Sequence, residues 1–432
     1  MNRRIVLWLS WLLPCQLFAQ SLAECQSAAE RNYPLIRQYD LIDRMSAVTV
    51  ENIGKDWLPQ ITATAQATYQ SDVAAWPSEM KSLLSQMGVD AKGLKKDQYR
   101  VGVDVIQPVY DGGVIKSRRQ IAQRQADLEQ TQTDVTLYEV RKRVNEMYFS
   151  LLLIDEQKRL TEDLQQLLLS NEKKLSSMLS HGTAAESDYL SVKAERLGVE
   201  QQLESLKSRR QLLLLLLSTF CGINVTNPEK PSANPAGEGG IRPEERLIDS
   251  RIRLADAEEK LLDANLRPRF SLFASTFYGY PGYNMFDDMM HRSWSLNGLV
   301  GMRLTWNIGA LYTRKGDKKR LQLQREQAET SLHVFLFNNH LDQLQQTEET
   351  NRYRKMMESD DEIIALRTSV RKAAESKLAH GIIDVNDLVK EINNENNAKV
   401  QRSTHEIEML KQLYDLRFTV NADNIGSGSA AQ

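Results

Sequence analysis

Apolar residues along the chain follow two different periods. From Ser21 to about Lys55 they recur at the spacing of one helix face, which predicts a helix that breaks at Pro34. From Ile61 to Tyr69, and again from Arg100 to Val105, apolar and polar residues alternate. This period of two predicts a pair of strands, each with one apolar and one polar face.

A proline-free helical pattern of about seventy residues follows Gly113 and ends at His181. Its apolar positions are sparse at first and become denser farther along. Such a stripe is typical of a coiled-coil wall that contacts water on two sides, rather than of a helix inside a globule. A second helix is expected from about Glu186 to Phe220. The segment from Gly222 to Arg242 is rich in Pro, Gly and Asn and is predicted to be a linker.

The same order of elements recurs after the linker. A helix from Pro243 to Asn265, strands from Phe270 to Tyr278 and from Trp294 to Trp306, and a second long helical pattern match the first half. The last helix is expected from Asp384 to about Phe418. The chain is therefore predicted to be a tandem duplication. Its segments are a signal peptide at 1–19, a first repeat at 20–221, the linker at 222–242, a second repeat at 243–420 and a small, polar, disordered tail at 421–432.

A short motif interrupts the long helical pattern in each repeat. It holds a histidine, a glycine and an aspartate six residues after the glycine: His181, Gly182 and Asp188 in the first copy, and His380, Gly381 and Asp387 in the second. Glycine just past a helix end takes a positive φ at little steric cost, so each copy predicts a tight turn between two helices. Thr183 and Glu186 have capping-box spacing, and Asp384 is expected to cap the last helix.

The bulk charge and the first residues of the chain bear on its location. Lys and Arg total 55 against 57 Asp and Glu, so bulk attraction to nucleic acid is not expected. Arg3 and Arg4 precede a short apolar run from Ile5 to Leu13, which is typical of a secretory signal. Cys15 suggests a lipidation site, but Pro14 directly before it disfavours that interpretation.

Two cysteines, Cys25 and Cys221, remain after removal of the predicted signal peptide. An exported protein has the opportunity to pair them, but two cysteines are not a disulfide framework. The sequence favours free buried thiols.

The residues that commonly carry catalysis are scattered. The histidines show no metalloprotease, nucleophile-elbow or phosphate-loop pattern, so we expect no enzyme, no catalytic residue and no cofactor. His181 and His380 are best explained as polar residues at helix ends, ahead of a metal or pH-sensing role. Met and His from Met285 to His291 suggest copper binding, but a mobile outer loop is the preferred interpretation, and no metal site is predicted.

The strands indicate how the protein meets a membrane. No mature segment holds 18 consecutive apolar residues, and four strands cannot close a barrel. Three copies supply about twelve amphipathic strands, an even number found in outer-membrane barrels. Eight aromatic residues lie near the strand ends, as in an interfacial belt: Trp57, Tyr69, Tyr99, Tyr110, Phe270, Tyr278, Trp294 and Trp306. The alternative is a soluble periplasmic coiled-coil scaffold without a pore.

The ordered set of motifs resembles the TolC family of outer membrane efflux proteins. It consists of Pro59, the junction from Gln107 to Gly113 with its counterpart at Asn307-Ile308-Gly309, and the two His-Gly-to-Asp turns. The resemblance implies a mainly α fold in which a homotrimer forms an α-barrel and a 12-stranded β-barrel. It further implies an outer-membrane channel, largely periplasmic, that works with a periplasmic adaptor and an inner-membrane pump in efflux or type I secretion.

The resemblance also assigns roles to the two turns. In the family they are the periplasmic tips, where the adaptor docks and the tunnel closes. The docking residues carried over are His181, Gly182, Thr183, Glu186, Asp188, His380 and Gly381, and the gate residues are Asp384, Asp387 and Lys390. The family commonly has aspartates six and nine residues after the second glycine. Here Asp387 matches and Lys390 departs, so a purely acidic constriction is not expected.

Overall fold

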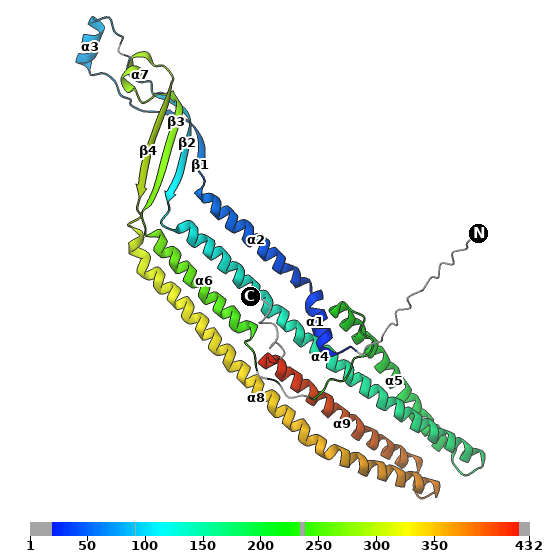
Figure 1. The fold of residues 1–432 in the computed structure, drawn as a ribbon. Coiled ribbons are helices and arrows are strands. Elements are labelled where there is room, and N and C mark those ends of the chain that lie inside the picture. Colours follow the sequence, from blue (N-terminus) through cyan, green and yellow to red (C-terminus); the bar gives the residue numbers. More distant parts are fainter. Residues whose placement is uncertain (1–19, 91, 234–236, 238, 423–432) are drawn as a thin grey trace, which may run out of the picture. The chain divides into compact units, whose positions relative to one another are not determined.

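The structure is a computed structural model that describes residues 20–90, 92–233, 237 and 239–422. The predicted signal peptide, Cys15 and residues 423–432 lie outside the described residues. The elements follow the predicted order (Figure 1). They are α1 Leu22–Asn32, α2 Arg37–Gly54, β1 Gln60–Tyr69, α3 Ser78–Gln86, β2 Asp97–Tyr110, α4 Val114–Ser180, α5 Glu186–Cys221, α6 Pro243–Asn265, β3 Arg269–Tyr280, α7 Met285–His291, β4 Ser295–Thr305, α8 Ala310–Ala379 and α9 Val385–Val420.

The chain divides into two compact units. One comprises Met1–Gln38, Gln132–Arg246 and His333–Gln432, and the other comprises Tyr39–Thr131 and Leu247–Leu332. We call them the hairpin unit and the sheet unit. Each half contributes two strands, a long helix and a shorter returning helix, which is the element order expected of a duplicated chain. The break at Pro34 is also confirmed: α1 ends before it, and a 3-10 turn, Pro34–Ile36, leads into α2.

The sheet unit holds one antiparallel sheet in the strand order β1-β2-β3-β4. Its register aligns Ile61 with Val105, Val105 with Ala274, and Ala274 with Val300, so one row of apolar side chains crosses all four strands. A second row on the same face holds Ala65, Val101, Tyr278 and Leu296. Ile61 is 70% and Val300 79% exposed. The predicted alternation therefore produces a sheet with one solvent-exposed apolar face in the single chain.

Aromatic side chains lie at both ends of this sheet. At one end the Tyr99 and Trp294 rings are stacked with centroids 5.9 Å apart, and Tyr278 lies 5.4 Å from Trp294. At the other end Tyr110 and Trp306 are partly exposed, and the Trp306 indole donates a hydrogen bond of 2.9 Å to the Leu266 carbonyl. Both groups have apolar rings with polar atoms, the combination found where strands leave a membrane.

The segments that join the strands at one end of the sheet pack against each other, and the second, predicted as a loop, contains the short helix α7 (Figure 1). Leu94, Tyr280 and Met289 form a small core between the two connections. Asp288 is 2% exposed and accepts a 2.6 Å hydrogen bond from the Gly282 N–H. These bonds assign structural roles to part of the methionine-rich segment. Among the described residues no group of three or more potential ligands is placed to hold a metal ion.

The junctions between strand and long helix differ in the two repeats. Gly112 and Gly113 have φ values of 74° and 90°, and the Asp111 carboxylate accepts a 2.9 Å hydrogen bond from the Gly113 N–H. The backbone turns sharply here, and both positions favour glycine because their φ values are positive. Gly309, at the matching place, is not among the described glycines with a positive φ. The second junction therefore follows another backbone path.

The hairpin unit contains the returning helices α5 and α9 with the segments of α4 and α8 beside them. None of the helices in the described residues is both long and apolar enough to cross a membrane. Asn421 and Ala422, which the sequence placed in the disordered tail, are buried, at 2% and 8% exposed. Asn421 ends α9 with a φ of 53° and donates a 2.7 Å hydrogen bond to the Ile241 carbonyl, so these two residues are part of the folded hairpin unit.

Candidate functional site

The two predicted turns have the same backbone hydrogen bonds. In each, the glycine N–H bonds to the carbonyl three residues back, and the next N–H bonds to the carbonyl five residues back. The bonds are Gly182 to Leu179 (2.9 Å) and Thr183 to Met178 (2.8 Å) in the first turn, and Gly381 to Leu378 (2.9 Å) and Ile382 to Lys377 (2.9 Å) in the second. With φ values of 71° and 69° at the glycines, both are Schellman caps.

The histidines before these glycines close the preceding helices. His181 Nδ1 lies 2.7 Å from the Ser177 carbonyl oxygen, and His380 Nδ1 lies 2.7 Å from the Ser376 carbonyl oxygen. Both side chains are exposed. Each of these carbonyls also accepts the backbone N–H of the same histidine at 3.2 Å, so the imidazole adds a second contact to the end of the helix. The contact of each imidazole with a backbone carbonyl explains why a histidine recurs at this position.

The helices that follow the turns begin differently, and one capping prediction is wrong. α5 has Ala185 as its N-cap, with no side-chain hydrogen bond. The Thr183 hydroxyl instead donates to the Met178 carbonyl at 3.0 Å, because the Schellman bonds place Thr183 beside the helix it leaves. In the second turn the Asp384 carboxylate accepts a 2.9 Å hydrogen bond from the Asp387 N–H, so the predicted cap of α9 is confirmed.

The three residues carried over as a gate lie on one exposed region at the start of α9. Asp384, Asp387 and Lys390 are exposed, whereas Val385 and Leu388 between them are 1% exposed. The buried pair orients the first turns of α9 and directs the charged residues to solvent. In the described part of the chain, Lys390 forms no ion pair with Asp387. In the first turn Glu186 is exposed and Asp188 is half-buried.

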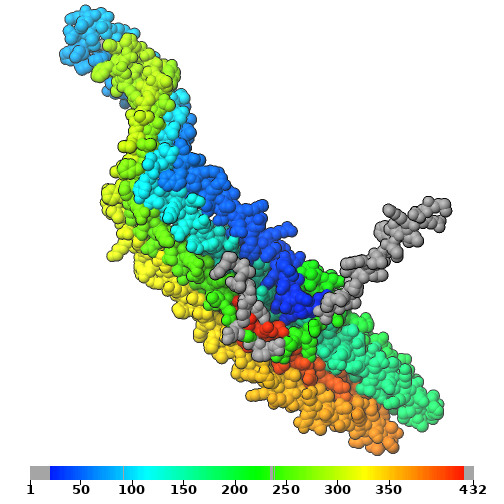
Figure 2. Space-filling view, viewed as in Figure 1, coloured from blue at the N-terminus to red at the C-terminus, as the bar shows by residue number. Residues whose placement is uncertain are grey.

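The ends of the two hairpins pack on each other (Figure 2). One apolar cluster joins α4, α5, α8 and α9, and its buried members are Leu164, Leu168, Leu175, Val192, Val199, Ala374, Val385, Leu388 and Ile392. Beside it the Asn393 amide donates a 2.8 Å hydrogen bond to the Glu195 carboxylate, from α9 to α5. The structure thus places the two turns, whose glycines lie far apart in the sequence, in one compact end of the hairpin unit.

Ion pairs with opposite polarity link the helices of each hairpin. Glu172 of α4 pairs with Arg196 of α5 at 2.5 Å. Arg371 of α8 pairs with Glu395 of α9. In both hairpins the first residue lies ten positions before the turn glycine and the second fourteen after it, so the charges are exchanged between equivalent positions.

The exchange includes a third position, four residues farther along the returning helix. Glu200 pairs with Arg196 at 3.0 Å, and Lys399 pairs with Glu395 at 2.8 Å. Burial acts to raise the pKa of the Glu395 carboxyl, but hydrogen bonds from Lys399, Thr368 and Arg371 outweigh it and hold this pKa below its usual range. The spacing of apolar residues gives no signal for these charges, whereas the two repeats aligned on their turn glycines show the exchange.

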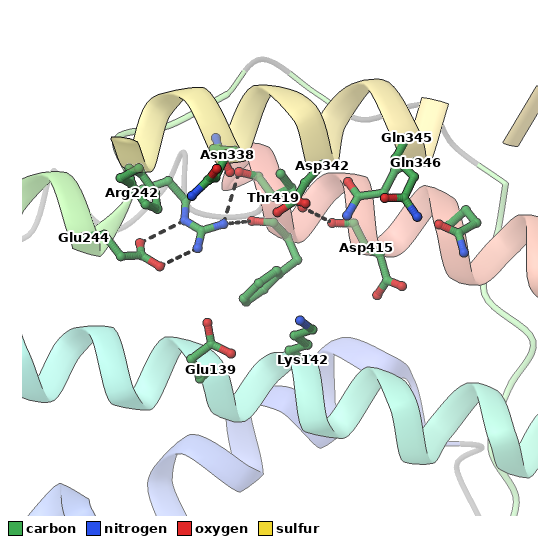
Figure 3. Close-up of a pocket in the computed structure, with 14 residues that line it drawn as sticks. Glu139, Lys142, Arg242, Glu244, Asn338, Asp342, Gln345, Gln346, Asp415 and Thr419 are labelled. Carbon is green, nitrogen blue, oxygen red and sulfur yellow. Dashed lines mark hydrogen bonds and ion pairs between the residues drawn. The ribbon is translucent and has the colours of Figure 1, made fainter. Parts of the chain in front are cut away.

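A polar cavity of about 450 Å³ lies elsewhere in the hairpin unit (Figure 3). Arg242 borders it, 6% exposed, and its guanidinium donates to the Phe418 and Thr419 carbonyls at 3.1 Å each. The same group pairs with Glu244. Burial raises the pKa of the Asp415 carboxyl, which also lines the cavity. The sequence offered no signal for this cluster, because Arg242 was only the last residue of a linker.

Replacing a turn glycine by alanine should destabilise the hairpin unit. Gly182→Ala or Gly381→Ala places a Cβ on a residue with positive φ, which costs about 1–2 kcal/mol. The matched control is Gly198→Ala inside α5, where an added Cβ has open space and alanine is expected to stabilise by about 0.5–1 kcal/mol. Urea unfolding of the purified variants measures both. Equal effects of the three substitutions would show that the turns impose no backbone requirement.

Comparison with protein families supports one assignment. The family model described as "Outer membrane efflux protein" matches residues 29–222. A comparison with curated protein sequences found no match.

Solved structures resemble the chain over most of its length. The outer membrane protein VceC from Vibrio cholerae is 12% identical with a TM-score of 0.66, and the match covers 92% of this chain and 94% of VceC. The outer-membrane channel OprN is 13% identical with a TM-score of 0.67, covering 93% and 90%. The CmeC outer membrane channel of Campylobacter jejuni is 12% identical with a TM-score of 0.64, covering 93% and 85%. At these identities the likeness establishes the fold.

Proposed function

Since the chain belongs to the outer membrane efflux protein family, the TolC family, we propose that it is the outer-membrane duct of a tripartite export system. It is a passive channel in this proposal. A periplasmic adaptor connects it to an inner-membrane pump, which supplies the energy for efflux or secretion of small molecules or proteins. The observation that carries the proposal is the four-stranded sheet with its exposed apolar face.

The edges of that sheet argue for assembly. β1 and β4 are its two edge strands, and within the described part of the chain each has one side without a strand partner. Unpaired backbone groups cannot face hydrocarbon, because each costs several kcal/mol there. Pairing β4 of one copy with β1 of the next removes both edges. Three copies then close a barrel of about twelve strands with the apolar face towards lipid.

The hairpin ends suit docking and closure in such a trimer. The first turn offers exposed His181, Thr183 and Glu186 to an adaptor, and the second offers His380. Three Asp387 side chains, one from each subunit, concentrate negative charge at the second turn. Since Lys390 does not pair with Asp387 inside one chain, the lysine remains free to pair with Asp387 of a neighbouring subunit. Closure then rests on contacts between subunits.

Removal of the gate aspartate should loosen closure. Asp387→Ala leaves the cap of α9 in place, because Asp384 accepts from the backbone N–H of residue 387. We expect cells with this variant to become more susceptible to hydrophilic antibiotics that the outer membrane normally excludes. The matched control is Asp188→Ala, the aspartate at the same place in the first turn, which is assigned to adaptor docking and should leave the conductance of the purified pore unchanged. Unchanged susceptibility and unchanged pore conductance with Asp387→Ala contradict the gate assignment.

Membrane fractionation separates the duct from the alternative, a periplasmic coiled-coil scaffold without a pore. The duct is recovered in the outer membrane as a heat-modifiable trimer on gels. A scaffold is released as a soluble protein when spheroplasts are prepared. Release of this chain with the periplasmic contents therefore overturns the proposed function.

A further inference from the structure

Two cysteine thiols that are far apart in the sequence lie against each other in the hairpin unit. Cys25 lies in the first half of α1, and Cys221 is the last residue of α5. α1 packs against α5, and the two thiols are near enough to shift each other's pKa, raising that of Cys25 and lowering that of Cys221. Cys25 is 0% and Cys221 1% exposed. The sequence left pairing open but favoured free buried thiols, and the structure places both cysteines on helices that pack together.

Other contacts hold the two helices together at this point. The Asn32 amide, at the end of α1, donates to the Thr219 and Phe220 carbonyls at 3.3 and 3.2 Å. The Tyr33 and Phe220 rings pack with centroids 5.8 Å apart. Gly222 follows Cys221 with a φ of 68°, and a Cβ there would collide with the Asn32 side chain. The packing of α1 on the end of α5 is therefore held by neighbours that do not depend on any cross-link.

We propose that Cys25 and Cys221 form a disulfide bond that fastens α1 to the end of α5 in the mature protein. A protein that reaches the outer membrane passes through the periplasm, where dithiols are oxidised. Exported chains with two thiols held in contact are suitable substrates for that oxidation. The two cysteines lie outside the turns and the sheet, so the disulfide does not depend on the proposed transport function.

The oxidation balances with a protein disulfide as the electron acceptor. A thiol of the unfolded chain attacks the disulfide of an exported thiol–disulfide oxidoreductase and forms a mixed disulfide. The second cysteine then attacks the chain's own sulfur in that bond. The new sulfur–sulfur bond forms, and the oxidoreductase leaves as a dithiol that carries the two electrons and the two protons of the original thiols.

The geometry assigns an order to these steps. Cys25 is the first of the two to enter the periplasm and is the residue expected in the mixed disulfide. Cys221 enters later and is therefore the attacking sulfur that resolves the mixed disulfide. Because both side chains are buried in the folded chain, the exchange must finish before α1 packs fully, and reductants cannot reach the bond afterwards.

Peptide mass spectrometry tests the bond directly. The full chain is purified from outer membranes of a host with intact thiol oxidation, denatured without reductant in the presence of iodoacetamide, and digested. The proposal predicts one linked peptide pair that contains Cys25 and Cys221 and separates on reduction. Two unlinked peptides, each alkylated at its cysteine, overturn it.

Cysteine variants give a second, independent test. If the residues are bonded, Cys25→Ala, Cys221→Ala and the double variant should each lower the melting temperature by about 5–10 °C, to the same extent. Folding the wild type in a host without the oxidoreductase should lower it equally and leave the variants unaffected. Two smaller single effects that add up to the double effect indicate packed free thiols and contradict the proposal.

Discussion

Arg242→Ala is expected to destabilise the hairpin unit by about 3 kcal/mol, because it removes one partner of a buried ion pair. The guanidinium is 6% exposed and pairs with Glu244, which is itself largely buried. It also satisfies the last carbonyls of α9 at Phe418 and Thr419 and lies over the Tyr138 ring at 4.7 Å. Alanine leaves the carboxylate and the carbonyls without these donors (Figure 3).

Two further variants identify the cause of that loss. Arg242→Lys keeps the charge but not the forked donor geometry, so it should recover only part of the stability. Arg246→Ala, one helical turn away and exposed, should change the free energy of unfolding by less than about 0.5 kcal/mol. Urea unfolding of the purified proteins provides the comparison. If Arg242→Ala were as stable as Arg246→Ala, Arg242 would not stabilise the contact between the start of the second repeat and the end of α9.

Reversing one charge of the second hairpin is expected to have a similar effect. In Glu395→Arg a cation replaces a carboxylate that is 5% exposed in its side chain and lies between Arg371 and Lys399. We expect a loss of at least about 3 kcal/mol, since three cations then share a buried site. The triple variant Arg371→Glu, Glu395→Arg and Lys399→Glu rebuilds the polarity of the first hairpin and should recover most of the stability. Failure to recover would show that the ion pairs depend on other neighbours.

The pH dependence follows from the lowered pKa of Glu395. A carboxyl whose pKa is lower in the folded than in the unfolded chain contributes stability above its unfolded pKa, near 4.5, and loses it as the pH falls through the folded pKa. Wild type should therefore lose its advantage over Glu395→Gln as the pH is lowered below about 4.5. A constant difference between the two proteins from pH 7 to pH 3 would contradict this assignment.

The exchanged charges also specify which helices pair. If α4 met α9 in the equivalent register, Glu172 would face Glu395, and Arg371 would face Arg196 if α8 met α5. Like charges at a half-buried contact disfavour both arrangements. The exchanged charges thus distinguish the two hairpins, which are otherwise similar. Single-sequence periodicity cannot reveal this, because both hairpins have the same pattern of apolar and polar positions.

Much of the fold was predictable because its signals are local. The alternation from Ile61 to Tyr69 fixes which side chains share a face, and the register then aligns those faces across four strands. Gly182 and Gly381 made their turns predictable because glycine adopts a positive φ at little steric cost. The two carbonyls that Arg242 binds lie at the other end of the second repeat, and no residue near the arginine in the sequence points to them. The prediction that Thr183 caps α5 was wrong for a related reason. Capping-box spacing does not determine whether the hydroxyl bonds to the following helix or to the preceding one.

The central claim is that copies of this chain assemble into a duct through the outer membrane. Its most direct test is the conductance of planar lipid bilayers that receive the protein purified from outer membranes, as wild type and as Asp387→Ala. The account predicts discrete ion-conducting steps, with larger or more frequent openings for Asp387→Ala than for wild type. Membranes that conduct no better than protein-free bilayers with either protein would contradict it.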